Sequence, residues 1–213
     1  LGQSTPAILS AVGIHPWWLD QVLAGDMTVL YSQILQRANV ACCVAVGESG
    51  LDKFIDTPLA LQQKVCELHI KAANELALPL ILHCRKAHNE MLLLLKRYPC
   101  RAGGVIHAFS GSIELALRYV ELGFYLGAGG TITYERANKT REAFRRIPID
   151  AIVLETDAPD MPLNGCQGQR NSPEAIPIIA KKLAELRGES LDFIAQCSTF
   201  NAERLFKLND YCL

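Results

Sequence analysis

Short apolar runs alternate along the chain with longer segments whose apolar residues recur at helical spacing. A short apolar run bounded by polar residues is typical of a buried strand, and apolar residues three and four positions apart are typical of an amphipathic helix. The alternation therefore predicts repeated strand–helix units and a parallel sheet. The predicted strands cover residues 7–15, 42–48, 78–83, 104–109, 124–128 and 151–157.

Helices are predicted between these strands and at the end of the chain. Ser112 and Ser190 stand where N-terminal caps are expected, each with an acid two residues later, and Gly123 and Gly188 follow periodic runs as helix stops do. No linker-like or low-complexity segment interrupts the pattern, which predicts a single domain over residues 1–213. The predicted helices cover residues 20–38, 58–76, 89–98, 112–122, 138–146, 173–187 and 191–208.

Polar residues at the strand ends favour one α/β architecture over another. A TIM-type (β/α)8 barrel gathers its site from the carboxyl ends of several strands. An open doubly wound sheet places its ligand at one switch point, with a glycine-rich turn, and no GxGxxG phrase occurs here. We therefore expect a TIM-type barrel, although the pattern yields six strands rather than the eight that such a barrel needs.

Five strand ends carry residue types suited to metal binding: His15, Glu48, His83, His107 and Asp157. Imidazole and carboxylate together are ligands for zinc, manganese, iron or nickel, and carboxylate with water suits magnesium. Any one of the histidines, taken alone, is more simply explained as a hydrogen-bonded core or loop residue. Ionisable groups directly after apolar runs are costly to bury unless paired or metal-bound, so their recurrence in unit after unit favours a shared site.

The other two histidines serve as comparisons. His69 lies in the middle of the predicted helix 58–76, which favours a surface or packing role, and its replacement by alanine is expected to have little effect on any catalytic rate. His88 stands at the predicted start of a helix, and both a structural and a functional role stay open for it.

Charge and composition narrow the class of protein. Lys and Arg number 21 against 22 Asp and Glu, so the net charge of −1 gives no strongly basic clamp, and any polyanion must be bound by local basic loops. The apolar runs are far shorter than the ~20 residues of a membrane helix. Eight cysteines lie scattered without a CxxC pair, as in a reducing compartment. We expect a cytoplasmic, monomeric protein that does not enter a membrane.

Six phrases and a closing one carry a family resemblance: GIHP, VGESGLD, LPLILHCR, GVIHAFSGS, LGAGGTIT, LETDAPDMPL and FNAERLF. In this order they resemble the TatD family of metal-dependent deoxyribonucleases, within the amidohydrolase superfamily. The resemblance covers essentially the whole chain. It implies a TIM-type barrel that hydrolyses phosphodiester bonds of DNA, as single strands or at ends, at a site with two divalent metals, either zinc, magnesium or manganese.

The resemblance also implies roles for the residues at the strand ends. Glu48 matches the carboxylate that bridges the two metals, and His83 and His107 match the imidazoles on the second metal. Asp157 matches a ligand of the first metal and the base for the attacking water. His15 matches a histidine beside the metals that contacts the substrate or the transition state.

Further residues are expected around these. Glu155 alternates onto the same strand face as Asp157 and is expected to support the ligands from behind. Basic loops and aromatic rings near strand ends are expected to hold the phosphates and stack the bases, with Trp17 and Trp18 as further stacking candidates. The expected substrate-binding residues are Arg85, Ser110, Gly111, Tyr134 and Arg136.

One family phrase is missing. The first strand of the family carries DxHxH, whose two histidines bind the first metal, and no HxH occurs among the five histidines here. Together with the two missing strands, this predicts that about two units, roughly 50 residues at ~30 per unit, precede Leu1 in a chain of about 260 residues. A chain of 213 residues alone is expected to be poorly soluble and inactive and to bind at most one metal tightly.

Two other classes of function stay open. One is a small-molecule hydrolase acting on an amide, lactone or phosphoester with the same metals. Superfamily members of that kind often carry a lysine at the position of Glu48, so Glu48 favours the phosphodiesterase. The other is a catalytically impaired chain that acts only as a binding protein.

Overall fold

The computed structural model describes residues 8–19 and 26–208. Its internal contacts form two compact units: one runs as far as Val105 and includes the segment from Glu203 onward, and the other spans Ile106–Ala202. Each unit is described by itself below. The single domain expected over residues 1–213 stays a prediction.

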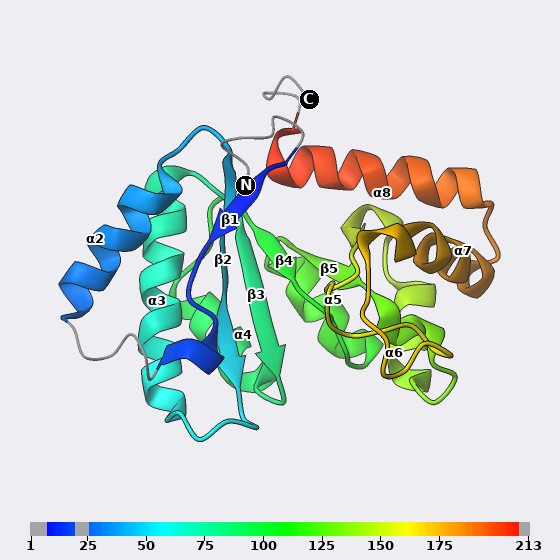
Figure 1. The fold of residues 1–213 in the computed structure, drawn as a ribbon, viewed down its shortest axis with the longest axis horizontal. Helices are drawn as coiled ribbons and strands as arrows, with labels where there is room; N and C mark the ends of the chain where they lie inside the picture. The colour runs from blue at the N-terminus through cyan, green and yellow to red at the C-terminus, as the bar shows by residue number, and fades with distance from the viewer. Residues whose placement is uncertain (1–7, 20–25, 209–213) are drawn as a thin grey trace. The chain divides into compact units, whose positions relative to one another are not determined.

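The first unit contains a parallel sheet covered by helices (Figure 1). Strand β2 pairs with β1 on one side and with β3 on the other, and nine of its ten residues are buried. Its first four residues, CVAV, form the kind of continuous apolar run that is typical of strands buried on both faces of a parallel sheet. The strands and the short 3-10 helix of this unit are β1 (Ser10–Val12), η1 (Pro16–Trp18), β2 (Cys43–Asp52) and β3 (Leu80–Arg85).

Local chemistry explains the helices of this unit. Asp26 accepts a hydrogen bond from the Thr28 amide and so caps α2. Helix α3 ends at Ala77 in a left-handed conformation, packs its apolar face on β2, and has α2 along its outer side (Figure 1). The helices are α2 (Met27–Ala38), α3 (Leu59–Leu76) and α4 (His88–Arg97).

The second unit repeats the strand–helix pattern. Strands β5 and β6 pair in parallel, and the rings of Phe109, Tyr119 and Phe144 pack edge to face in the core. Ser112 caps α5, as its position in the sequence predicts. The elements are α5 (Ile113–Glu121), β5 (Phe124–Ala128), η2 (Gly130–Thr133), α6 (Asn138–Arg146), η3 (Ile149–Ala151), β6 (Ile152–Leu154), η4 (Pro173–Ala175) and α7 (Ile176–Arg187).

Two further elements complete the chain, β4 (Gly104–Ile106) and α8 (Leu191–Phe206). Strands β1, β2 and β3 pair in parallel in the first unit, and β5 pairs in parallel with β6 in the second, which confirms the expected α/β class with parallel strands. The part of the predicted helix 20–38 before Asp26 lies outside the described residues. No helix in the described part of the chain is long and apolar enough to span a bilayer.

Strand ends are where the sequence prediction needs correction. Strand β2 does not end at Glu48 but continues to Asp52, and β3 continues past His83 to Arg85. Strand β6 is shorter than predicted at both ends: it begins only at Ile152, because residues 149–151 form a 3-10 turn, and it ends at Leu154 rather than at Asp157. Polar side chains thus occur inside ladders as well as after them, which apolar periodicity does not reveal.

Candidate active site

Glu48 lies on β2 beside His83 on β3. The strand register shifts around Glu48, and a β-bulge of this kind re-aims the side chain at the irregular position. Glycines flank the bulge for a steric reason: a Cβ atom on Gly47 would overlap the Ile81 carbonyl oxygen, and one on Gly50 would overlap that of His83. The phrase VGESG therefore allows the two strands to approach closely and brings Glu48 next to the imidazole.

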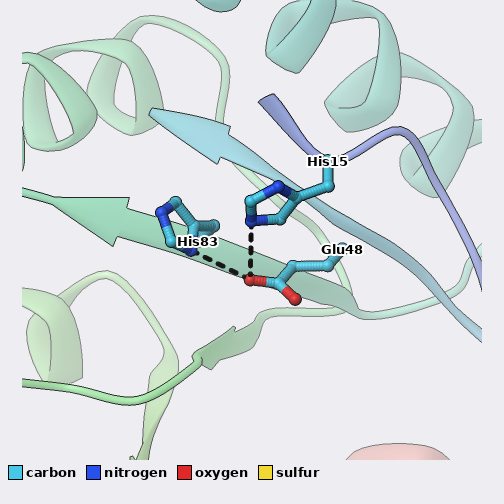
Figure 2. Close-up of side chains that lie close together, drawn as sticks. All are labelled: His15, Glu48 and His83. Carbon is cyan, nitrogen blue, oxygen red and sulfur yellow. Dashed lines mark hydrogen bonds and ion pairs between the residues drawn. The ribbon is translucent and has the colours of Figure 1, made fainter. Parts of the chain in front are cut away.

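His15, Glu48 and His83 point toward one another (Figure 2). Glu48 Oε1 lies 3.1 Å from His83 Nδ1 and 3.6 Å from His15 Nε2, and the two imidazole centroids are 4.5 Å apart. One ligand-type atom from each residue lies within 4.8 Å of the other two, and all three residues are half-buried. The carboxylate of Glu48 and the imidazole of His83, side by side at this spacing, are donors that suit a divalent cation such as zinc.

His15 has a second role in the backbone. It precedes η1, and its Nδ1 accepts a hydrogen bond of 3.2 Å from the Trp17 amide, as an N-cap does. A neutral imidazole that accepts at Nδ1 carries its proton on Nε2, the nitrogen that faces Glu48. In this tautomer His15 is a hydrogen-bond donor toward the cluster rather than a cation ligand.

His69 holds the chain just before this turn. The Ile14 amide donates to His69 Nε2 at 3.0 Å, and His69 Nδ1 lies 2.8 Å from the Val65 carbonyl oxygen. The His69 side chain is fully buried on α3, and this burial lowers its pKa to about 4 although the bond to Val65 acts in the opposite direction. Its burial and its two bonds agree with the packing role expected for His69, and the small effect of His69→Ala on the rate of hydrolysis stays a prediction.

His107, Glu155 and Asp157 form a second cluster, in the second unit. His107 directly follows β4, its Nδ1 lies 2.7 Å from Glu155 Oε2, and its Nε2 lies 3.0 Å from Asp157 Oδ1. The other Glu155 oxygen accepts a 2.6 Å hydrogen bond from the Ala108 amide. Glu155 thus fixes both the ring of His107 and the backbone after it, while about a third of the Asp157 side chain is exposed.

Glycines make room for the Glu155 carboxylate. A Cβ atom on Gly127 would lie 2.5 Å from Glu155 Oε2, and one on Gly129 would lie 3.2 Å from Oε1. At the first distance the Glu155 carboxylate would have to shift to admit a side chain. The phrase LGAGG at the end of β5 therefore serves the neighbouring carboxylate directly.

Asp52 is a site residue that the sequence analysis missed. It closes β2 and is fully buried, and its Oδ2 lies 2.8 Å from Trp17 Nε1 and 3.3 Å from His83 Nε2. Burial alone raises the pKa of this carboxyl, but the hydrogen bonds from Trp17, the Phe54 amide and His83 outweigh it and keep the pKa below its usual range. Its place at the end of the VGESGLD phrase was the available indication, and it was not used because the strand was predicted to end at Glu48.

The substrate-binding candidate of the first unit lies beside Asp52. Arg85 is exposed, its guanidinium lies 4.5 Å from the centroid of the Phe54 ring, and its NH1 lies 4.0 Å from Asp52 Oδ2. Trp17 and Trp18 are both more than half exposed, at 53% and 55%.

The candidates of the second unit have structural partners. Ser110 and Gly111 precede α5, and the Ser110 hydroxyl lies 3.2 Å from a threonine hydroxyl of α6. The Tyr134 hydroxyl donates to the Pro162 carbonyl at 2.7 Å, which leaves the ring rather than the hydroxyl for stacking. The exposed Arg136 guanidinium lies 5.2 Å from the centroid of that ring.

Comparison with known proteins places the chain in a family. The family model described as TatD related DNase matches residues 1–207. The chain belongs to the TatD family. The resemblance carried by the seven phrases is thereby confirmed, and with it the class of metal-dependent hydrolase.

Two relatives illustrate the range of the TatD family. The uncharacterized metal-dependent hydrolase YjjV of Escherichia coli K12 is 43% identical over 209 residues, which cover 98% of this chain and 80% of YjjV. The 3'-5' ssDNA/RNA exonuclease TatD of Pectobacterium parmentieri is 33% identical over 207 residues, covering 93% of this chain and 78% of the exonuclease.

Solved structures agree on the fold. The crystal structure of E. coli YjjV has a TM-score of 0.91 at 43% identity and covers 97% of this chain and 80% of that one. A TatD family hydrolase from Entamoeba histolytica has a TM-score of 0.78 at 22% identity, covering 93% and 74%, and shows the shared fold alone. The predicted TIM-type α/β class is confirmed by these neighbours, and the convergence of both clusters on common metal ions stays a prediction.

Proposed function

We propose that this TatD family member hydrolyses phosphodiester bonds of DNA with a metal-activated water, acting on single strands or strand ends. The observation that carries the proposal is the Glu48 carboxylate, whose Oε1 lies 3.1 Å from His83 and 3.6 Å from His15. Relatives named 3'-5' ssDNA/RNA exonuclease support a nucleic-acid substrate and add RNA to the substrates worth testing.

Four residues would hold two divalent cations: Glu48, His83, His107 and Asp157. The imidazole and carboxylate donors of this set suit zinc, manganese or magnesium. Bound cations supply Lewis-acid stabilisation of the phosphate and lower the pKa of a coordinated water.

Asp157 and His15 would move or hold the protons. The Asp157 carboxylate is partly exposed, so it can accept a proton from the attacking water and return it to the leaving oxygen. His15, with its Nδ1 occupied by the Trp17 amide, presents Nε2–H and can donate to a phosphate oxygen as that oxygen gains charge.

The DNA strand would be held by local basic loops, because the chain as a whole carries no net positive charge that could attract it. Arg85 and Arg136 are exposed and can pair with phosphates, and Ser110 and Gly111 can contact the backbone of the strand. The exposed ring of Trp17 can stack on a base.

An activity assay tests the proposal. Asp157→Asn should lower the rate of hydrolysis of a labelled single-stranded DNA by about a thousandfold, because an amide cannot accept the proton. Asp160→Asn is the matched control, since Asp160 is an exposed acid three residues away, and it should keep the parental rate.

Three outcomes have distinct meanings. Loss in Asp157→Asn alone supports the proposal, whereas equal rates in both variants would refute the role of Asp157. Absence of DNA and RNA hydrolysis in the parent protein, together with turnover of a lactone or phosphotriester, would replace the nuclease with a small-molecule hydrolase.

A further inference from the structure

The buried Asp52 carboxylate lies near four nitrogen-containing groups: an indole, an imidazole, a guanidinium and a backbone amide. Its Oδ2 faces the Trp17 indole N–H at 2.8 Å, His83 Nε2 at 3.3 Å and an Arg85 guanidinium nitrogen at 4.0 Å. Its Oδ1 accepts a 2.8 Å hydrogen bond from the Phe54 amide. A carboxylate without solvent exposure is retained only where such partners compensate for its desolvation.

The backbone at Asp52 does not need this side chain. The Asp52 amide donates to Gln62 Oε1 at 2.7 Å, and Gln62 Nε2 donates to the Asp52 carbonyl at 2.9 Å. Gln62 therefore ties the end of β2 to α3 through both backbone groups. The carboxylate, apart from its bond to Phe54, is directed at side chains of the candidate site.

His83 stands between two carboxylates. Its Nδ1 faces Glu48 Oε1 at 3.1 Å, and its Nε2 faces Asp52 Oδ2 on the other side. A neutral imidazole has one N–H, and an ionised carboxylate can only accept. His83 can therefore donate to only one of the two carboxylates, and its tautomer decides which one. Asp52 is the deeper of the two acids and already accepts from Trp17, which fixes its Oδ2 in place for Nε2–H.

We propose that Asp52 is a positioning residue for His83: it accepts Nε2–H, directs the Nδ1 lone pair toward Glu48, and holds the Trp17 indole at the edge of the same cluster. This inference rests on the proposed metal site but not on the identity of the substrate. Carboxylates that hold the far nitrogen of a ligating imidazole fix its tautomer and orientation and raise its basicity.

The hydrogen bond from Trp17 to Asp52 also positions the Trp17 ring beside the two histidines of the cluster. The Trp17 ring lies 5.0 Å from the ring of His15, edge to face, and 6.4 Å from the ring of His83. Because one Asp52 oxygen contacts both the indole and the imidazole, a change at Asp52 alters both at once. Loss of the indole N–H alone should change the position of the Trp17 ring and leave the contact between Asp52 and His83 in place.

Histidine tautomers of the metal-free protein give the first test. Long-range proton–nitrogen spectra of ¹⁵N-histidine-labelled protein, with His83→Gln for assignment, should show His83 protonated at Nε2. In Asp52→Asn the amide NH2 group can donate to Nε2, and the Nδ1–H tautomer should appear. Protonation of His83 at Nδ1 in the parent protein would overturn the proposal, whether or not any variant folds.

Metal affinity gives the second test, with Zn²⁺ alone as the probe in a chelator-competition titration. Asp52→Asn should bind Zn²⁺ about 10–100-fold more weakly. Asp56 is an exposed acid in the loop that follows β2, and Asp56→Asn should bind Zn²⁺ as the parent does. Trp17→Phe keeps a ring but no N–H and should stay within about threefold of the parent, a smaller change than the loss of a ligand-supporting carboxylate.

The outcomes separate this proposal from the nuclease. Parental affinity in a folded Asp52→Asn would refute it, as would equal losses in Asp52→Asn and Asp56→Asn. Neither measurement uses nucleic acid, so a protein without nuclease activity that shows the expected tautomer and affinity change would support Asp52 positioning while refuting the DNA substrate.

Discussion

His69 makes the stability of the first unit depend on pH. Its Nε2 must stay unprotonated to accept the Ile14 amide, since a protonated imidazole would set one N–H against another. Its side chain is fully buried, and burial lowers the pKa from an ordinary 6.5 to about 4. Protonation is therefore disfavoured in the folded chain and free to occur in the unfolded one.

The sign and size of the effect follow from this difference. Between pH 6.5 and 4 the unfolded chain binds a proton that the folded chain does not, so stability is complete above pH 6.5 and falls as the pH is lowered. A difference of about 2.5 pKa units at 1.36 kcal/mol per unit corresponds to about 3 kcal/mol. Below pH 4 both states are protonated and this loss is complete.

His69→Gln isolates the contribution. A glutamine amide oxygen can accept from the Ile14 amide in place of Nε2 but does not titrate. Urea unfolding followed by tryptophan fluorescence reports on the first unit, because both tryptophans of the chain, Trp17 and Trp18, lie in it. The free energy of unfolding of the parent should fall by about 3 kcal/mol more than that of His69→Gln between pH 7 and pH 4.

A parallel pH dependence of the two proteins would refute the reasoning, because it would mean that the imidazole titrates alike in the folded and unfolded chains. His69→Ala provides a separate check at pH 7. It leaves the Ile14 amide without its acceptor, so it should cost about 1–3 kcal/mol.

Three further predictions concern other positions. Gly50→Ala places a methyl group on the His83 carbonyl at a φ of 156°, and urea unfolding should show a loss of about 3 kcal/mol or more. Asn201 is buried and donates at 2.8 and 2.7 Å to two carbonyls beside β6, so Asn201→Ala should cost about 2–3 kcal/mol, measured by thermal unfolding. Tyr31 donates to Glu75, which raises the pKa of its phenol to about 12; Glu75→Gln should return that pKa toward 10, read from phenolate absorbance against Tyr31→Phe.

The helices were largely predictable because residues next to their ends, such as capping side chains, determine where they begin and end. Helix α6 occupies the predicted residues 138–146, and α5 begins after the predicted cap Ser112. The predicted helix 173–187 instead divides at Ala175 into η4 and α7, both with proline in the first turn. Proline in the first turn suits either kind of helix start, so the sequence pattern alone does not separate them.

The candidate site was predictable in its residue types and less so in its connections. The strand-end rule found Glu48 and His83, which the structure brings together, although neither ends its strand. It passed over Asp52, four residues beyond Glu48, because a β-bulge lengthens β2 and the bulge has no periodic pattern. The sequence also favoured a packing role for His69 but did not predict the hydrogen bond that it accepts from the Ile14 amide, 55 positions away.

The three imidazoles of the two clusters differ in what contacts the ring nitrogen that faces away from the proposed cation. We call this the far nitrogen and the other one the near nitrogen. His83 Nε2 faces Asp52 and His107 Nδ1 faces Glu155, and a carboxylate at the far nitrogen draws the proton there and leaves the near nitrogen with a lone pair. His15 is the reverse, because its Nδ1 accepts an amide proton and its near nitrogen carries N–H. Two imidazoles are thus suited to a cation and one to an oxygen that gains charge. The sequence alone does not distinguish the cation ligands from the donor, because all three histidines follow apolar runs in the same way. They differ only in the group that contacts the far nitrogen of the ring.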